Sequence, residues 1–207
     1  ILKQEGIKVV HVVSSSKFAL KAQDAGCDAV VAEGFEAGGH NGREETTTMV
    51  LIPAVCEAVH IPVIAAGGIA TGRQMLAAMV LGASAVQIGS RFIATPEASS
   101  HDAFKQQVLQ TGEGETILAL KQLTPVRLIR NEFCRQVLDA EQRCASKEEL
   151  EQLLGRGRAK KGMFEGDLQE GELEVGQVSA LIREIKPAAD VVEEIWQEFL
   201  QLQQSRW

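Results

Sequence analysis

The sequence predicts an α/β fold built on a parallel sheet, and two observations predict it. Short, β-branched apolar segments have the length and composition of strands, at residues 7–13, 28–32, 62–66 and 85–89. Segments of helical character lie between and after them, at residues 16–25, 48–59, 71–81 and 101–110. Strands that alternate with helices are typical of consecutive right-handed βαβ units, in which neighbouring strands run parallel.

Helix boundaries in this part of the chain carry recognisable signals. Gly26 and Gly82 stand where a helix ends and a left-handed residue is favoured. Thr71 precedes Gln74 by three residues, which is the spacing of a capping box at a helix start. We therefore expect each helix to end just before the next strand begins.

The chain changes character after residue 111. A helix is predicted over residues 125–141, with Val126, Ile129, Phe133 and Val137 on one face. Ser146 and Glu149 form a second capping box, opening a short helix that stops at Gly155. Residues 155–176 are predicted to form a loop, followed by helices at 176–185 and 188–203. The last helix carries an apolar stripe that predicts packing on a core, with a partner-binding face as the alternative; the stripe comprises Val192, Ile195, Trp196, Phe199 and Leu202.

Composition excludes several classes of protein. The 207 residues are 45% hydrophobic and 24% charged, which is the balance of a folded globule. A net charge of −7 argues against nucleic acid or an anionic membrane surface as the main partner. Apolar runs fall far short of the ~20 residues of a membrane span, and no secretory leader is recognisable. Four widely spaced cysteines indicate neither a zinc site nor a disulfide framework, so we expect a cytoplasmic protein without a metal.

Two glycine-rich strand ends predict a phosphate site. Gly67, Gly68 and Ile69 follow one strand, and Gly89 and Ser90 follow the next. Several backbone N–H groups can converge on a phosphate at such turns, and the positive end of the following helix adds to the attraction. The alternative is that these glycines only permit tight turns.

The same turns set the position of the strands in a TIM (β/α)8 barrel, where phosphate sites follow strands 7 and 8. The four strands would then be barrel strands 5–8, and we expect the chain to be the C-terminal portion of a longer enzyme. The predicted organisation is half a barrel at residues 1–110, a mostly helical lid or substrate subdomain at 111–175, and C-terminal helices packing back on the barrel at 176–207.

A histidine lies in a glycine-rich loop after the strand at 28–32. Gly38 and Gly39 precede His40, and barrel active sites are assembled from loops of this kind. An imidazole that titrates near neutral pH can move a proton or stabilise a developing charge. Glu36 could orient the loop or bind a hydroxyl group. The other three histidines, His11, His60 and His101, are interpreted as structural.

Three segments together resemble a known family. They are residues 32–42 (AEGFEAGGHNG), 62–69 (PVIAAGGI) and 86–92 (VQIGSRF). They resemble the FMN-dependent nitronate monooxygenases (2-nitropropane dioxygenases) and enoyl-ACP reductase II. The resemblance covers residues 1–110 and resumes at residues 173–182 (LEVGQVSALI).

The resemblance implies non-covalently bound FMN and assigns roles to residues. It implies that the FMN phosphate is bound by Gly67, Gly68, Ile69, Gly89 and Ser90. Gly38 and Gly39 would flank the isoalloxazine and the substrate, Glu33 would join the cofactor site, and His40 would be the catalytic histidine. A cysteine on a glycine-rich rim loop, as in IMP dehydrogenases, is missing from this sequence.

The resemblance leaves two enzymatic branches open. The spelling Ala32-Glu33-Gly34 favours the reductase, in which NAD(P)H is the co-substrate and an enoyl thioester in fatty-acid synthesis is reduced. The alternative is oxidation of an alkyl nitronate with FMN and O2. A basic cluster would bind the NADPH phosphate or an acidic carrier protein, or would be a solvated loop; it comprises Arg156, Arg158, Lys160 and Lys161.

The expected partners follow from these hypotheses. They are a small-molecule or acyl-carrier-bound substrate and, as a further hypothesis, a second copy in a homodimer, with no nucleic acid and no membrane. A hypothesis from another class is a flavin-less fragment or interaction module that uses exposed sheet edges.

Overall fold

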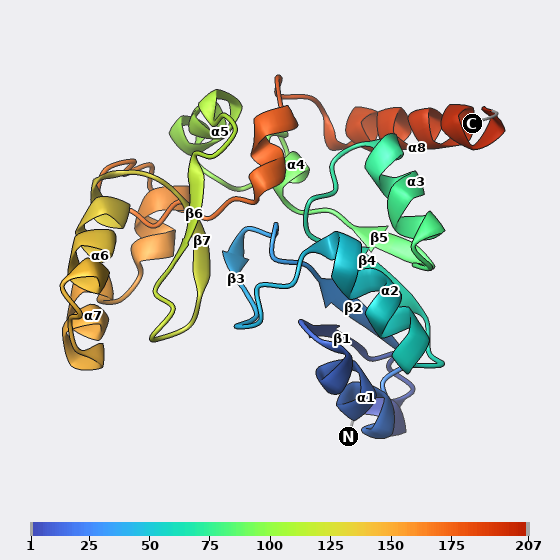
Figure 1. The fold of residues 1–207 in the computed structure, drawn as a ribbon. Helices are drawn as coiled ribbons and strands as arrows, with labels where there is room; N and C mark the ends of the chain where they lie inside the picture. Colours follow the sequence, from blue (N-terminus) through green and yellow to red (C-terminus); the bar gives the residue numbers. More distant parts are fainter. Residues whose placement is uncertain (1, 206–207) are drawn as a thin grey trace. The chain divides into compact units, whose positions relative to one another are not determined.

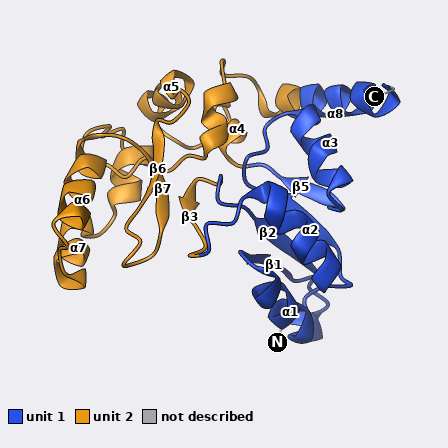
Figure 2. Cartoon of the chain, in the orientation of Figure 1, with its two compact units in different colours: residues 1–36, 44–88, 192–207 blue, residues 37–43, 89–191 orange. Residues whose placement is uncertain are grey.

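The structure is a computed structural model that describes residues 2–205. The chain divides into two compact units (Figure 2). Unit 1 comprises residues 1–36, 44–88 and 192–207, and unit 2 comprises residues 37–43 and 89–191. Within residues 2–205, no helix combines the length and apolar character needed to cross a membrane.

Unit 1 contains the predicted parallel sheet (Figure 1). Its strands lie in the order β1-β2-β4-β5 and all pair in parallel. The strands are β1 (Val10–Val13), β2 (Ala29–Glu33), β4 (Val63–Ala66) and β5 (Ala85–Gln87). The helices that connect them are α1 (Ser16–Asp24), α2 (Thr48–Ala58) and α3 (Gly72–Val80), and a short 3-10 helix precedes β1 at Leu2–Glu5. The α/β alternation is confirmed, whereas the numbering of these strands as barrel strands 5–8 stays a prediction.

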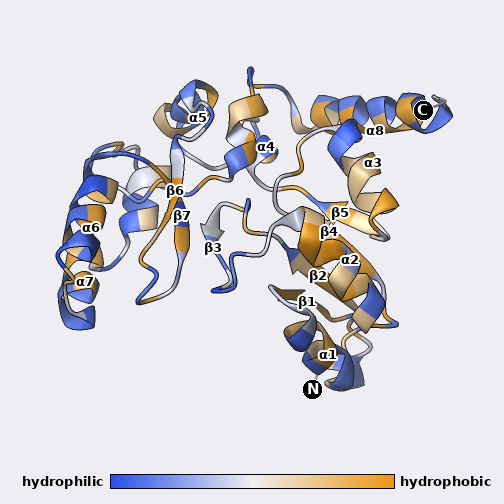
Figure 3. Cartoon of the chain, viewed as in Figure 1, coloured by the Kyte–Doolittle hydropathy of each residue, from blue (hydrophilic) through white to orange (hydrophobic). Residues whose placement is uncertain are grey.

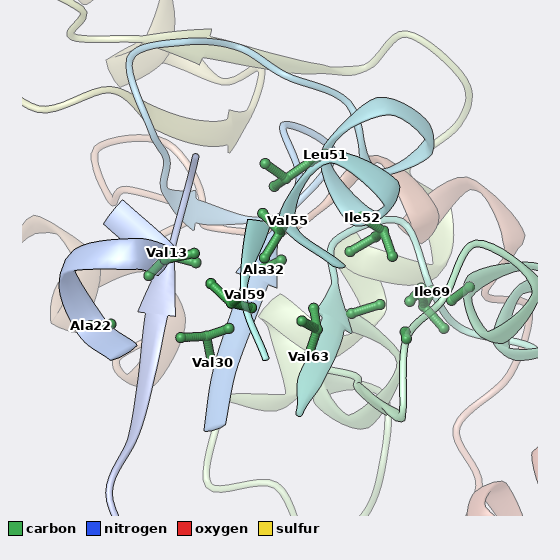
Figure 4. Close-up of a cluster of buried hydrophobic side chains, with 14 residues drawn as sticks. Val13, Ala22, Val30, Ala32, Leu51, Ile52, Val55, Val59, Val63 and Ile69 are labelled. Atoms are coloured by element: carbon green, nitrogen blue, oxygen red, sulfur yellow. The ribbon is translucent and has the colours of Figure 1, made fainter. Parts of the chain in front are cut away.

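One apolar cluster packs the helices of unit 1 against its sheet (Figure 4). Leu51, Ile52 and Val55 of α2 are at most 2% exposed and lie against Val30 and Val63 of the strands. Figure 3 colours most of α2 in the apolar range, in keeping with this burial. Burying a large aliphatic side chain contributes about 1.5–3 kcal/mol, so these three residues of α2 stabilise its packing on the sheet.

The predicted signals at the helix ends are present. Thr71 Oγ1 accepts a hydrogen bond from Gln74 N at 3.2 Å, and Gln74 Oε1 accepts one from Ala70 N at 2.8 Å. Gly26 and Gly82 have φ values of +85° and +110°, which favour glycine. These contacts make the turn between β4 and α3 a fixed structure.

The last helix, α8 (Ala188–Gln204), begins in unit 2 and continues in unit 1. In unit 1, Glu198 Oε2 accepts a hydrogen bond from Gly72 N at 2.7 Å, and Phe199 is buried. Val192 and Trp196 are 55% and 45% exposed, so the predicted core stripe is buried only in part.

The helix predicted over residues 125–141 is wrong in its first part. Residues Val126–Ile129 form β7, which pairs antiparallel with β6 (Thr116–Ala119) on one side and with β3 (Gly39–His40) on the other. All four residues of β7 are buried. A helix with one apolar face would leave some of four consecutive residues exposed. The helix starts only at α6 (Glu132–Gln142), where Asn131 Oδ1 accepts a hydrogen bond from Cys134 N at 2.9 Å.

The rest of unit 2 is mostly helical. Its α-helices are α4 (Ser90–Ile93), α5 (Asp102–Gln110) and α7 (Lys147–Leu154). The loop predicted at 155–176 contains a π-helical turn at Lys160–Phe164, where Gly162 and Gly171 lie in close contact. The helix predicted at 176–185 is a 3-10 helix, Gln177–Leu181, because the chain becomes extended at Ile182 to bury that side chain. The domain boundaries predicted at residues 110 and 175 stay predictions.

Candidate active site

The turn after β4 presents backbone N–H groups in unit 1. Gly67 and Gly68 have φ values of +87° and +72°, a left-handed conformation that favours glycine at both positions. Among the hydrogen bonds of residues 2–205, none uses the N–H of Gly68 or Ile69 as donor. Ala70 and Thr71 separate the turn from the nine-residue helix α3, whose first N–H, that of Gly72, donates to Glu198 Oε2. This arrangement is suited to an anion such as a phosphate monoester.

Close packing requires glycine on both sides of this turn. A Cβ on Gly67 would lie 2.7 Å from Gly34 O, and a Cβ on Gly34 would lie 2.5 Å from Thr48 N. Glu33, the last residue of β2, pairs in register with Ala66, and burial raises the pKa of its carboxyl group. The structure thus brings the predicted residues Glu33, Gly67, Gly68 and Ile69 together at the carboxyl ends of β2 and β4.

Glu36 orients the loop, which is one of the two roles expected for it. Its Oε2 accepts hydrogen bonds from Thr48 N at 2.9 Å and from Thr48 Oγ1 at 3.0 Å. Thr48 is the first residue of α2, so the Glu36 carboxylate caps that helix. A Cβ on Gly68 would lie 3.3 Å from Glu36 Cβ, which places this anchored side chain beside the glycine turn.

In unit 2, Gly38 and Ser90 both lie against Gly176. A Cβ on Gly38 would lie 2.5 Å from Gly176 N, and that N–H donates a hydrogen bond to Ser90 Oγ at 2.9 Å. Gly89 precedes Ser90 and would have open space around a Cβ. The predicted residues Gly38, Gly39, His40, Gly89 and Ser90 therefore belong to unit 2, and the assignment of one phosphate site to residues of both units stays a prediction.

His40 is exposed and stands on β3, where it pairs with Val126 of β7. Asn41 fixes the chain after it: its N–H donates to Pro125 O at 2.8 Å, and its Nδ2 donates to Gly39 O at 3.1 Å. His40 also lines a pocket of about 260 Å³ in unit 2. We call this cavity the His40 pocket. Its other lining residues are Leu120, Leu123, Thr124, Val126, Leu154, Gly155, Gly157, Arg158, Ala159, Glu172 and Glu174.

Backbone strain is present at the same pocket. Leu120, 1% exposed, has a φ of +57°, which is rare for a residue with a bulky side chain. It follows β6, and Leu123 N donates a hydrogen bond to Leu120 O at 2.9 Å. Strained residues of this kind are concentrated at functional sites, which supports the pocket as a site.

Two carboxyl groups in the His40 pocket have perturbed pKa values. Burial, the neighbouring Glu174 and, in the opposite sense, Arg158 set the pKa of Glu172 at about 7. Burial also raises the pKa of Glu174, while the charge of His40 acts to lower it. Acids with raised pKa values that line a pocket together with a histidine are typical of sites that transfer protons.

Sequence reasoning assigned no role to Glu172 and Glu174. The signal that would have found them is the alternation in Glu172-Leu173-Glu174-Val175, since acidic and apolar residues at period two predict a strand with one polar face. Leu173 and Val175 are each 1% exposed, as this pattern requires.

Most side chains of the predicted basic cluster bind other groups of this chain. Arg158 donates hydrogen bonds to three carbonyl oxygens and binds Glu170 Oε2 at 3.1 Å. Lys160 and Lys161 each form an ion pair at 3.0 Å, with Glu165 and Asp167. The contacts favour a structural role for Arg158. His101 is also structural, since its Nδ1 accepts a hydrogen bond from Ala103 N at 3.1 Å.

Comparison with known proteins identifies the family. A family model described as nitronate monooxygenase matches residues 1–198. The chain belongs to the nitronate monooxygenase family.

Relatives that are named for different activities match this chain. A probable nitronate monooxygenase of Staphylococcus saprophyticus is 37% identical over 147 residues, which are 66% of this chain and 41% of the relative. The (3aS,4S,5R,7aS)-5-hydroxy-7a-methyl-1-oxo-octahydro-1H-indene-4-carboxyl-CoA dehydrogenase of Rhodococcus jostii is 41% identical over 120 residues, 58% of this chain and 33% of the relative. The chain thus spans 41% of the length of the first relative and 33% of the second.

Solved structures share the fold over nearly the whole chain. FabK from Thermotoga maritima superposes with a TM-score of 0.92 and 42% identity, covering 98% of this chain and 64% of that protein. Nitroalkane oxidase from Streptomyces ansochromogenes superposes with a TM-score of 0.80 and 31% identity, covering 98% and 60%.

Proposed function

We propose that this protein is an FMN-dependent oxidoreductase that reduces an enoyl thioester with NAD(P)H, in the manner of enoyl-ACP reductase II. The observation that carries the oxidoreductase assignment is the family match over residues 1–198, which includes the glycine turn and the His40 loop. The curated relative named as a carboxyl-CoA dehydrogenase supports redox chemistry on a thioester.

The glycine turn of unit 1 fits the phosphate of FMN. Gly67 and Gly68 hold it in a conformation that a Cβ would strain, and the N–H groups of Gly68 and Ile69 are free of partners within residues 2–205. We assign the FMN phosphate to this turn, with Gly89 and Ser90 as further candidates from the family resemblance. When bound, FMN supplies the hydride-transfer chemistry.

His40 is proposed to hold the proton that the reaction needs. Reduction of an enoyl thioester adds a hydride at the β-carbon and a proton at the α-carbon, and an imidazole at neutral pH can supply that proton. Gly38 and Gly39 hold the main chain before His40 in close packing, because Gly176 lies beside Gly38 and the Glu174 side chain beside Gly39. The apolar members of the His40 pocket, Leu120, Leu123 and Val126, would keep bulk water from the transferred proton.

Oxidation of alkyl nitronates with FMN and O2 is the second candidate. The curated relatives named as probable nitronate monooxygenases, at 37–40% identity, favour it. In that reaction His40 would handle the proton of the nitro compound.

Two assays on the purified, flavin-loaded protein separate these functions. NAD(P)H oxidation that depends on an enoyl thioester supports the reductase, and oxygen consumption that depends on a nitroalkane anion supports the monooxygenase. A protein that is colourless and releases no FMN on denaturation would contradict both and leave the hypothesis of an interaction module.

A further inference from the structure

We infer that Thr48 is a positioning residue for the glycine turn of unit 1. Its hydroxyl group holds carbonyl oxygens of that turn and so directs the N–H groups of the turn toward a phosphate. This inference rests on the proposed binding of the FMN phosphate at the turn. Thr48 is the first residue of α2, and both Thr48 and the turn belong to unit 1.

Two successive carbonyl oxygens at the turn face Thr48. Its Oγ1 donates a hydrogen bond to Gly67 O at 2.9 Å and lies 3.4 Å from Ala66 O. In a regular strand, successive carbonyl groups point to opposite sides. The arrangement therefore requires a departure from extended backbone, which the left-handed φ of Gly67, +87°, provides.

The planar peptide bond converts this contact into a direction for the N–H groups. All peptide bonds within residues 2–205 are trans, and in a trans peptide the C=O and the following N–H point in opposite directions. The N–H groups of Gly67 and Gly68 therefore face away from Thr48, on one side of the turn. Successive N–H groups on one side form a concave site for an anion.

Thr48 is itself held in place by its neighbours. Its N–H donates to Glu36 Oε1 at 3.2 Å and to Glu36 Oε2 at 2.9 Å, and its Oγ1 lies 3.0 Å from Glu36 Oε2. The hydroxyl carries one hydrogen, so Gly67 O and Glu36 Oε2 share it in a three-centre hydrogen bond. A Cβ on Gly34 would overlap Thr48 Oγ1, so glycine at position 34 leaves room for this hydroxyl.

A purely structural role for Thr48 makes a different prediction. If the hydroxyl only connected α2 to the end of β4, its loss would weaken the binding of any flavin to the same extent. If the hydroxyl directs N–H groups at a phosphate, its loss matters only for a ligand that carries one. The ratio of the affinities for FMN and riboflavin therefore separates the two roles.

The direct test is flavin binding by Thr48→Val, which removes the hydroxyl group and keeps the branched shape. Fluorescence titration should give about fivefold weaker binding of FMN and nearly unchanged binding of riboflavin, the loss expected for one hydrogen bond. Thr47→Val is the matched control, because Thr47 is exposed and its side chain makes no capping hydrogen bond. An unchanged preference for FMN in Thr48→Val, or an equal loss in both variants, would overturn the inference.

A second pair of variants keeps the inference testable if Thr48→Val folds poorly, since Gly34 packs closely on the position of the hydroxyl. Both Thr48→Ser and Thr48→Ala shorten the side chain, and only serine keeps the hydroxyl group. The serine variant should retain the preference for FMN and the alanine variant should lose part of it. The same preference in both would contradict the role of the hydroxyl.

Backbone dynamics separate this inference from the proposed function. In the flavin-free protein, the NMR order parameter of the Gly68 N–H should be lower in Thr48→Val than in the wild type, because the Gly67 carbonyl has lost its partner. If it falls and the wild type binds riboflavin as tightly as FMN, the hold on the turn stands and the proposed phosphate site fails. If the wild type prefers FMN and Thr48→Val changes neither that preference nor the order parameter, the inference about Thr48 fails alone.

Discussion

His40 is the residue on which the proposed chemistry depends, and its surroundings suit a proton donor that must meet a substrate. It is exposed, it pairs through β3 with Val126, and it lines a pocket together with the buried Glu172 and the half-buried Glu174. A proton donor must be accessible to its substrate, and an exposed imidazole at a pocket meets that requirement.

Replacing His40 with alanine should lower turnover by about 100-fold or more while FMN stays bound, since general acid catalysis commonly contributes 10²–10⁴-fold. Steady-state kinetics together with the visible flavin spectrum measure both effects. His60→Ala is the matched control, because His60 is an exposed histidine of unit 1 outside the site. Full activity in His40→Ala would remove the catalytic assignment.

Glu172 should make the stability of the protein depend on pH. Burial and Glu174 raise its pKa to about 7 in the folded state, against a value of 4.5 for an unperturbed glutamate. The folded protein therefore keeps a proton that the unfolded chain releases. This contribution to stability is complete below pH 4.5 and is lost as pH rises through 7, a change of about 3 kcal/mol.

Thermal unfolding at pH 5.5 and pH 8.5 measures this effect. Glu172→Gln should reduce the difference between the two pH values, and it should raise the melting temperature relative to the wild type at the higher pH. Glu151→Gln, at an exposed position on α7, serves as control and should leave the difference unchanged. A wild type whose stability is the same at both pH values would contradict the assignment of a buried, protonated Glu172.

At the scale of elements, one asparagine connects α6 to the segment that carries the acidic pair. Asn131 caps α6 through its Oδ1, and its Nδ2 donates to Leu168 O at 2.9 Å and to Gly171 O at 2.8 Å. Gly171 immediately precedes Glu172, so this side chain fixes the start of the extended segment.

Asn131→Ala should therefore destabilise the protein by about 2–3 kcal/mol, the sum expected for a helix cap and two further hydrogen bonds. Ser146→Ala is the comparison, because Ser146 makes one capping bond, with Glu149 N at 3.2 Å, and should lose about 1 kcal/mol. Urea unfolding of the two variants measures the difference. Equal losses would mean that the two bonds to Leu168 and Gly171 add nothing.

Elements with local signals were predictable from the sequence, and elements set by distant pairing were not. The strands and helices of unit 1 follow from β-branched runs, caps and terminal glycines such as Gly26 and Gly82. Residues Val126–Ile129 were predicted as helix because their apolar spacing continues into α6, and only pairing with β3 and β6 makes them a strand. The alternation at residues 172–175 predicts an extended segment, but only its bridge to β7 at Leu128 places Glu174 in the pocket that His40 lines.

At the scale of the whole molecule, the chain belongs to one family and each of its two units carries one candidate site. The glycine turn of unit 1 is suited to a phosphate, and the His40 pocket of unit 2 is suited to proton transfer. The sequence motifs predicted His40 and the glycines as site residues, because the chemistry proposed for them depends on which residue types stand in a loop. The capping role of Glu36 required the structure, since its partner Thr48 lies on another element.

The most direct test of the central claim compares the binding of FMN with that of riboflavin, which lacks the phosphate. Fluorescence titration of the wild type should give tighter binding of FMN, and Gly68→Ala should weaken FMN binding about tenfold or more while leaving riboflavin binding nearly unchanged. Gly26→Ala controls for backbone strain, because Gly26 also has a positive φ (+85°) and lies outside the turn. Equal affinity for FMN and riboflavin in the wild type, or an unaffected FMN affinity in Gly68→Ala, would contradict the proposal that this turn binds the flavin phosphate.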